Sequence, residues 1–208
     1  DGGSFKQSLG ACVALITLSR FAADAMRRYI HPLRIPVYAV AHPTDQTGFS
    51  KQTDRGIRAL CWGGEAVKVA LLGRQDRYTS TICCLKTDWE KVWVAGKPNP
   101  SLPCLPELTE SAVAKQLRQR GHPPDLIQDL QPPTVAPFMS NEAYDTFVLS
   151  HVIIVDLRSA SANNGVLEML VRGAPFFVNR LPAVEEYLGV DYPLYFDTPG
   201  DIERVISS

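Results

Sequence analysis

Residues 151–196, HVIIVDLRSASANNGVLEMLVRGAPFFVNRLPAVEEYLGVDYPLYF, decide the fold of this chain. An apolar run at 151–157 is followed by a loop rich in Ser and Asn, a helical pattern, a short strand, a second helix and another short strand. Alternation of this kind predicts parallel strands that are joined by covering helices. We therefore expect an α/β, Rossmann-like three-layer domain with a mostly parallel sheet.

Turn and capping signals divide the whole chain into further elements. Gly173 and Gly189 follow two helical patterns, where helices commonly end. Ser19 and Ser140 precede two others, as capping residues do. The segment 78–85 has a strand-like composition, but its place between two strands favours a helix. We predict strands at 12–18, 35–41, 55–62, 67–72, 91–95, 151–157, 175–179 and 194–196, and helices at 20–30, 78–85, 109–120, 141–149, 163–172, 183–188 and 199–206.

The composition is that of an ordinary globular protein. Of the 208 residues 45% are hydrophobic and 21% are charged, and the net charge is -1, so no basic footprint for nucleic acid or a membrane surface is present. The apolar runs are too short to span a bilayer. The five cysteines have no metal-ligand spacing, and we expect buried reduced thiols and a cytoplasmic protein without a signal peptide, a transmembrane segment or a metal site.

The loop at 158–165 is the first candidate for ligand binding. Its small residues let a ligand approach the backbone, and the helix that follows presents unpaired N–H groups and the positive end of its dipole. Ser161, Asn163 and Asn164 can therefore contact a phosphate or diphosphate. The alternative is that these side chains only cap the helix.

Glu168 is the second candidate. It lies one turn beyond Asn164, between the apolar residues Leu167 and Met169. A carboxylate near the end of a strand can accept hydrogen bonds from two ribose hydroxyls. The alternative is an exposed glutamate on the surface of a helix.

The order of these features resembles the nucleotide-sugar half of GT-B glycosyltransferases. The matching positions are Asn164, Glu168, Gly173, Ala174, Pro175 and 186–189. Upstream, residues 15–19 and His42 with Pro43 look like the last strand and helix of the N-terminal half and the crossover, and 71–74 looks like the start of the C-terminal half. The resemblance implies that 1–45 ends an N-terminal half, and that 46–208 is a donor-binding domain with a Pro-rich insertion at 96–137.

The resemblance also implies roles for individual residues. Glu168 would contact the ribose, Asn163 and Asn164 the phosphates, and Arg74 the diphosphate, with Arg77 as a weaker alternative for Arg74. An arginine fork matches phosphate oxygens well. Both arginines can equally form surface salt bridges. GT-B enzymes generally need no metal, so the nucleotide sugar is a substrate and no cofactor is expected.

His42 and Asp156 are further candidates for a cleft. His42 follows a strand in His-Pro-Thr-Asp, although a turn before proline is the simpler interpretation. Asp156 ends the strongest strand at the ligand-facing edge, where it can instead organise the loop. No Asp/His pair is placed as a general base, so the sequence identifies no catalytic residue.

We therefore expect a glycosyltransferase that moves a sugar from a nucleotide diphosphate sugar to an unidentified acceptor. Acceptor binding would need the missing N-terminal half or a partner subunit, because 208 residues without an initiating Met look like a piece of a longer protein. The alternative is a non-catalytic binding or structural subunit. It is favoured by Ala160, which stands where many retaining enzymes of this fold have a second glutamate. The chain has neither Gly-x-Gly-x-x-Gly after a strand nor a P-loop, which argues against a dinucleotide cofactor.

Overall fold

The computed structural model describes residues 9, 12–31, 34–41, 67–73, 77–86, 88–95, 108–127, 130–160 and 163–208. The chain divides into two compact units. Unit 1 comprises Asp1–Asp45, Ser159–Asn163 and Leu181–Tyr192. Unit 2 comprises Gln46–Arg158, Asn164–Arg180 and Pro193–Ser208.

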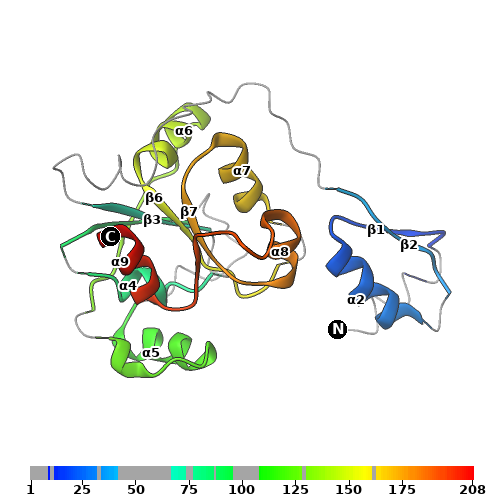
Figure 1. Cartoon of the computed structure of the whole chain (residues 1–208), viewed down its shortest axis with the longest axis horizontal. Coiled ribbons are helices and arrows are strands. Elements are labelled where there is room, and N and C mark those ends of the chain that lie inside the picture. Colours follow the sequence, from blue (N-terminus) through cyan, green and yellow to red (C-terminus); the bar gives the residue numbers. More distant parts are fainter. Residues whose placement is uncertain are drawn as a thin grey trace. The chain divides into compact units, whose positions relative to one another are not determined.

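Unit 2 contains a six-stranded sheet in which every neighbouring pair is parallel (Figure 1). The order across the sheet is β5-β4-β3-β6-β7-β8. The chain starts in the middle at β3, runs outward to β5, then returns to β6 and runs outward to the other edge. This is the doubly wound arrangement, and the direction of winding reverses between β3 and β6. The strands are β3 (Lys68–Leu72), β4 (Glu90–Val94), β5 (Thr134–Val135), β6 (Val152–Val155), β7 (Phe176–Asn179) and β8 (Tyr195–Phe196).

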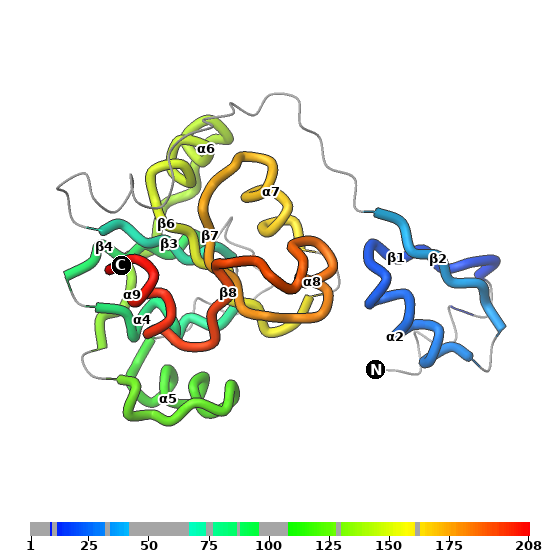
Figure 2. Tube along the Cα trace, in the orientation of Figure 1, coloured from blue at the N-terminus to red at the C-terminus, as the bar shows by residue number. Residues whose placement is uncertain are grey.

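Helices cover both faces of this sheet, so the predicted three-layer α/β fold is confirmed (Figure 2). Side chains of β3 and β6 alternate between the two faces. Val69, Leu71 and Ile154 belong to one buried cluster with residues of α4, α5 and α9. Helices α6 and α7 lie against the opposite face, where α6 contacts β6. The helices are α4 (Ser80–Cys83), α5 (Glu110–Gln119), α6 (Asn141–Ser150), α7 (Asn164–Arg172) and α9 (Pro199–Ser207), with a 3-10 turn η2 (Pro124–Leu126).

Side-chain caps explain where several helices begin. The Thr109 hydroxyl accepts a hydrogen bond from Ala112 N at the start of α5, and the Ser140 hydroxyl accepts one from Ala143 N at the start of α6. Each cap satisfies one of the N–H groups that have no partner within the helix. With these caps, α5 and α6 begin within one residue of the starts that the sequence predicts.

Unit 1 is a small parallel β-α-β unit with one further helix. Strands β1 (Leu15–Thr17) and β2 (Val37–Ala39) pair in parallel, and α2 (Arg20–Ile30) connects them. Helix α8 (Pro182–Leu188) packs on α2. The buried core of unit 1 contains Leu9, Ala23, Ile30 and Val37.

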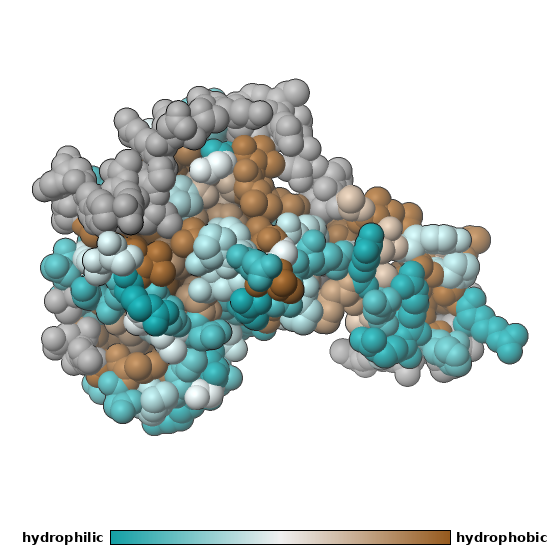
Figure 3. Space-filling view, in the orientation of Figure 1, coloured by the Kyte–Doolittle hydropathy of each residue, from teal (hydrophilic) through white to brown (hydrophobic). Residues whose placement is uncertain are grey.

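Unit 1 leaves apolar side chains of its sheet in solvent. Ile16 is 67% exposed and Tyr38, directly across from it, is 57% exposed; Leu18 and Val40 are exposed as well. Hydrophobic surface over this unit is visible in the space-filling view (Figure 3). Parallel sheets are normally covered on both faces, and two strands alone are marginally stable. This face therefore has the character of an incomplete sheet.

Glu186 of α8 binds the N-terminus of α2. Its Oε1 accepts a hydrogen bond from Arg20 N at 2.7 Å, and its Oε2 accepts one from Phe21 N at 3.0 Å. The hydroxyl of the next residue, Tyr187, donates to Leu18 O at 2.8 Å. The carboxylate thus satisfies two unpaired N–H groups at the positive end of the helix dipole.

We expect Glu186→Ala to lower the free energy of unfolding by about 1 kcal/mol, because two helix N–H groups lose a charged acceptor. Glu186→Gln should lose less, because its amide oxygen can still accept one of the two bonds. Chemical denaturation measures the loss, and amide hydrogen exchange at Arg20 and Phe21 localises it. Unchanged exchange at both amides in Glu186→Ala would show that this contact does not hold the helix end.

The sequence predicted most elements to within a few residues. The predicted helices at 20–30 and 78–85 are present as α2 and the shorter α4. Strand β5 was missed, because residues 96–137 were predicted to be loop apart from one helix. The predicted linker at 46–54 and strand at 55–62 lie outside the described residues, and the predicted domain division stays a prediction. Of the described cysteines, Cys83 is buried, Cys84 is partly buried and Cys12 is exposed, which corrects the expectation that all are buried.

Candidate functional site

The carboxyl ends of the parallel strands place polar residues along one edge of the sheet. Gly73 follows β3, Asp156 follows β6 and Asp197 follows β8, while Asn179 is the last residue of β7. In doubly wound sheets, ligands bind outside these carboxyl ends, at the point where the winding reverses. Here that point lies between β3 and β6.

Cationic side chains gather where the winding reverses. Arg77 pairs with Leu157 as an isolated antiparallel bridge. The guanidinium of Arg158 lies over the Tyr78 ring at 4.9 Å, and that of Arg120 lies 5.5 Å from the same ring. Arg77 packs so closely on Gly73 that a Cβ at position 73 would overlap its side chain, and the Gly73 φ of 123° also requires glycine. Glycine at position 73 therefore leaves room for the Arg77 side chain, whose backbone pairs with Leu157 just after β6.

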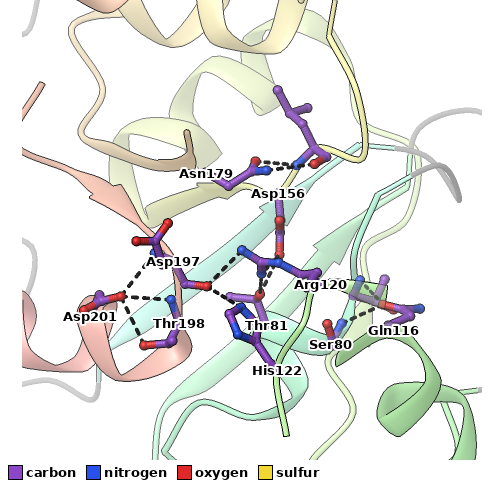
Figure 4. A network of polar contacts seen from close by, with 12 residues as sticks. Ser80, Thr81, Gln116, Arg120, His122, Asp156, Asn179, Asp197, Thr198 and Asp201 are labelled. Atoms are coloured by element: carbon purple, nitrogen blue, oxygen red, sulfur yellow. Dashed lines mark hydrogen bonds and ion pairs between the residues drawn. The ribbon is translucent and has the colours of Figure 1, made fainter. Parts of the chain in front are cut away.

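A network of polar contacts connects Arg120 with the buried Asp156 (Figure 4). Asp156 is completely buried, and its Oδ2 accepts hydrogen bonds from the Thr81 hydroxyl and from Arg120 Nη1, the latter at 2.9 Å. Arg120 Nη2 also donates to Asp197 O at 3.0 Å, and the His122 ring contacts the same carbonyl at 2.8 Å. The network joins α4, the end of α5 and the carboxyl ends of β6 and β8.

Further polar contacts order the ends of the neighbouring elements. Gln116 Oε1 accepts hydrogen bonds from Thr79 N at 2.7 Å and Ser80 N at 2.9 Å, so it caps the short helix α4. The Asn179 side chain exchanges two hydrogen bonds with the backbone of Leu157, at 2.7 and 2.8 Å. These contacts hold the loop after β6 in place, which is the loop that carries Arg158.

Burial raises the pKa of Asp156 to about 6, although Arg120, the Thr81 hydrogen bond, Arg77 and Arg158 act in the opposite direction. The unfolded chain titrates near the ordinary value of 3.8. The folded state therefore binds this proton more tightly, and the ionised carboxylate costs stability above pH 6. That cost is relieved as the pH falls through about 6 towards about 4.

We expect the stability of the wild type relative to Asp156→Asn to rise as the pH is lowered from about 6 to about 4, and to be constant between about 7 and 8. The asparagine cannot titrate, so the difference isolates Asp156. Denaturant unfolding at a series of pH values measures it. A difference that is constant over the whole range would contradict the raised pKa.

A cavity of about 260 Å³ opens beside Glu168 on the α6 and α7 side of the sheet. Glu168 is partly buried, and its Oε2 accepts a hydrogen bond from the Tyr144 hydroxyl at 3.2 Å. Among the described residues, Glu168 Oε1 has no hydrogen-bond partner. The cavity is lined by Val94, Pro137, Phe138, Met139, Asn141, Tyr144 and Glu168.

The other predicted site residues fall into three groups. Asn164 is the exposed first residue of α7, and Asn163 is the buried residue before it. Arg77 and Asp156 lie close together where the winding reverses, and Asp156 is buried and paired with Arg120. A place for either residue in a cleft stays a prediction. The contacts of Asp156 with Thr81 and Arg120 agree with the alternative role, in which Asp156 organises the loop after β6. Arg74, Ser161 and His42 lie outside the described residues.

Sequence reasoning missed Tyr144 and Arg120, and it assigned no role to Arg158. Arg158 directly follows the predicted strand at 151–157 and begins the candidate loop, which was a usable signal. Tyr144 and Arg120 had none, because each belongs to an ordinary amphipathic helix and meets its partner only through tertiary packing. Among the described residues, no group of three His, Cys, Asp or Glu side chains could hold a metal ion, and no helix is long and apolar enough to cross a membrane.

Comparison with known proteins supports the fold. No family model and no curated protein sequence matches the chain. The structure is similar to the crystal structure of an alpha,alpha-trehalose-phosphate synthase (UDP-forming) from Burkholderia vietnamiensis, with a TM-score of 0.59 and 12% sequence identity. The similarity covers 99% of this chain and 53% of that one, so this chain spans about half the length of the solved protein. The chain thus shares the Rossmann-type α/β fold of that structure.

Proposed function

We propose that this chain binds a nucleotide-sugar donor as the C-terminal half of a GT-B glycosyltransferase, which transfers the sugar to an acceptor. The observation that carries the proposal is the position of Glu168 at a cavity beside α6 and α7. Its Oε1 is available to accept hydrogen bonds from ribose hydroxyls. The apolar side chains of Val94, Pro137 and Met139 in the same cavity suit a flat nucleotide base.

The diphosphate would bind where the winding of the sheet reverses. Arg77 and Arg158 supply positive charge there, and the N-terminus of α7 at Asn164 presents backbone N–H groups. Donors held in place in this way stabilise the charge that develops on a departing nucleoside diphosphate. For Arg74, Ser161 and Asn163, the proposed phosphate contacts rest on the sequence alone.

We further propose that an N-terminal half or a partner subunit supplies the acceptor side of the site. Two observations support this: the exposed apolar face of β1 and β2 in unit 1, and a solved protein of similar fold that is nearly twice as long. The nucleotide sugar is the substrate in this proposal, which includes no metal and no other cofactor. We place the protein in the cytoplasm, as the free cysteines favour.

A second candidate function is nucleotide-sugar binding without catalysis, in a structural or regulatory subunit. Ala160 favours it, because many retaining glycosyltransferases of this fold carry a glutamate at that place. The two functions differ in turnover. A full-length form of the enzyme releases nucleoside diphosphate from the donor, and a binding subunit only binds the donor.

Thermal unfolding in the presence of UDP, GDP, ADP, CMP and their sugars tests the proposal. UDP comes first, because the similar solved protein is described as UDP-forming. A nucleotide at about 100 times its dissociation constant adds about 2.7 kcal/mol, which for a chain of this size raises the melting temperature by roughly 5–10 °C. We expect one nucleotide to give this shift. The absence of a shift with all of them would contradict donor binding by this chain.

A further inference from the structure

Tyr144 and Glu168 form one arrangement across helices α6 and α7. Tyr144 lies on the first turns of α6, and its hydroxyl donates to Glu168 Oε2 at 3.2 Å. Both side chains line the same cavity. Burial and the charge of Glu168 raise the pKa of Tyr144 above its ordinary value of 10, so its hydroxyl remains a donor at neutral pH.

A second pair of residues holds the Tyr144 ring. The guanidinium of Arg172 lies over this ring at 5.3 Å. Arg172 is itself fixed by an ion pair with Asp145 at 2.7 Å, and it donates to the backbone carbonyl of Glu168 at 3.3 Å. The tyrosine of α6 therefore contacts both a cation and a carboxylate of α7.

We propose that Tyr144 is a positioning residue that orients the Glu168 carboxylate for the 2′- and 3′-hydroxyls of the donor ribose. This inference rests on the proposed function. A carboxylate offers about four lone pairs, of which the tyrosine hydroxyl takes one at Oε2. Oε1 then remains able to accept from a ligand in the cavity that Glu168 lines. The tyrosine also holds a flexible glutamate in one rotamer before the ligand arrives, which reduces the entropy lost on binding.

This role couples Tyr144 to the ribose hydroxyls and to no other part of the nucleotide. A tyrosine that merely packed between α6 and α7 would affect every nucleotide equally, because loosened helices disturb the base, the ribose and the phosphates together. The positioning role instead predicts an effect that depends on whether the ligand carries the two hydroxyls. A nucleotide and its 2′,3′-dideoxy analogue separate these cases.

The experiment measures the dissociation constants of UDP and 2′,3′-dideoxy-UDP for the wild type and Tyr144→Phe by titration calorimetry. We expect Tyr144→Phe to weaken the binding of UDP roughly tenfold and the binding of the dideoxy analogue less than about twofold, since only UDP has the hydroxyls that engage Glu168. In a Glu168→Ala background, Tyr144→Phe should have no further effect on UDP. GDP and ADP with their dideoxy analogues are titrated in the same way.

Tyr187→Phe is the matched control. Its hydroxyl also donates one hydrogen bond, to Leu18 O at 2.8 Å in unit 1, and we expect its nucleotide affinities to equal those of the wild type. If Tyr144→Phe loses affinity equally for UDP and for the dideoxy analogue, or loses affinity for neither, the positioning role is overturned while nucleotide binding stays in place. If none of the nucleotides binds the wild type, the proposed function fails, and the positioning role fails with it.

Discussion

Replacing Arg120 with alanine is expected to lower the free energy of unfolding by about 3–5 kcal/mol, because it leaves the buried Asp156 carboxylate without its ion-pair partner. The Arg120 side chain is 8% exposed and Asp156 is fully buried, so water cannot replace the lost contact. The variant also loses the hydrogen bonds to Thr81 and to the Asp197 carbonyl. Chemical denaturation at pH 7 measures the effect.

Arg118→Ala provides the control for this prediction. Arg118 is exposed on the same helix, α5, and we expect its removal to change the stability by less than about 0.5 kcal/mol. An Arg120→Ala variant that is as stable as Arg118→Ala would show that the buried pair does not hold the carboxyl edge of the sheet together.

The second large effect concerns ligand affinity. We expect Glu168→Ala to reduce the affinity for the nucleotide that binds the wild type by roughly 10- to 100-fold. The reason is that hydrogen bonds to a charged acceptor contribute about 1.5–3 kcal/mol. Glu168→Gln should show a smaller loss, since one oxygen remains as an acceptor. Glu110→Ala, which removes an exposed glutamate from the start of α5, is the control and should bind as the wild type does.

The periodic and capping signals of the sequence account for most of the fold. Ser19, Thr109 and Ser140 begin helices whose apolar faces repeat at the expected spacing, and the alternation at 151–196 leads to the parallel sheet. These features are local, so a single sequence contains them. The two-residue strand β5 has no such signal. It exists because Thr134 and Val135 pair with β4, a contact between residues far apart in the chain.

The candidate site shows the same division between local and tertiary signals. Glu168 was predicted because a carboxylate between apolar residues on a helix after a strand is a recognisable pattern. Tyr144 lies 24 residues from Glu168, and Arg120 lies 36 residues from Asp156. Neither partner could be identified without the packing of α6 on α7 and of α5 beside the sheet. The same packing buries Asp156 and pairs it with Arg120, which the sequence alone did not indicate.

The most direct test of donor binding by this chain is a titration of UDP into the wild type and Glu168→Ala, with chemical shifts or a co-crystal structure to locate the ligand. We predict that UDP binds the wild type and changes the chemical shifts of Val94, Met139 and Tyr144 around the cavity. The affinity of Glu168→Ala for UDP should be lower by at least about tenfold. Binding of UDP with equal affinity to both proteins, or at residues away from this cavity, would contradict the role assigned to Glu168.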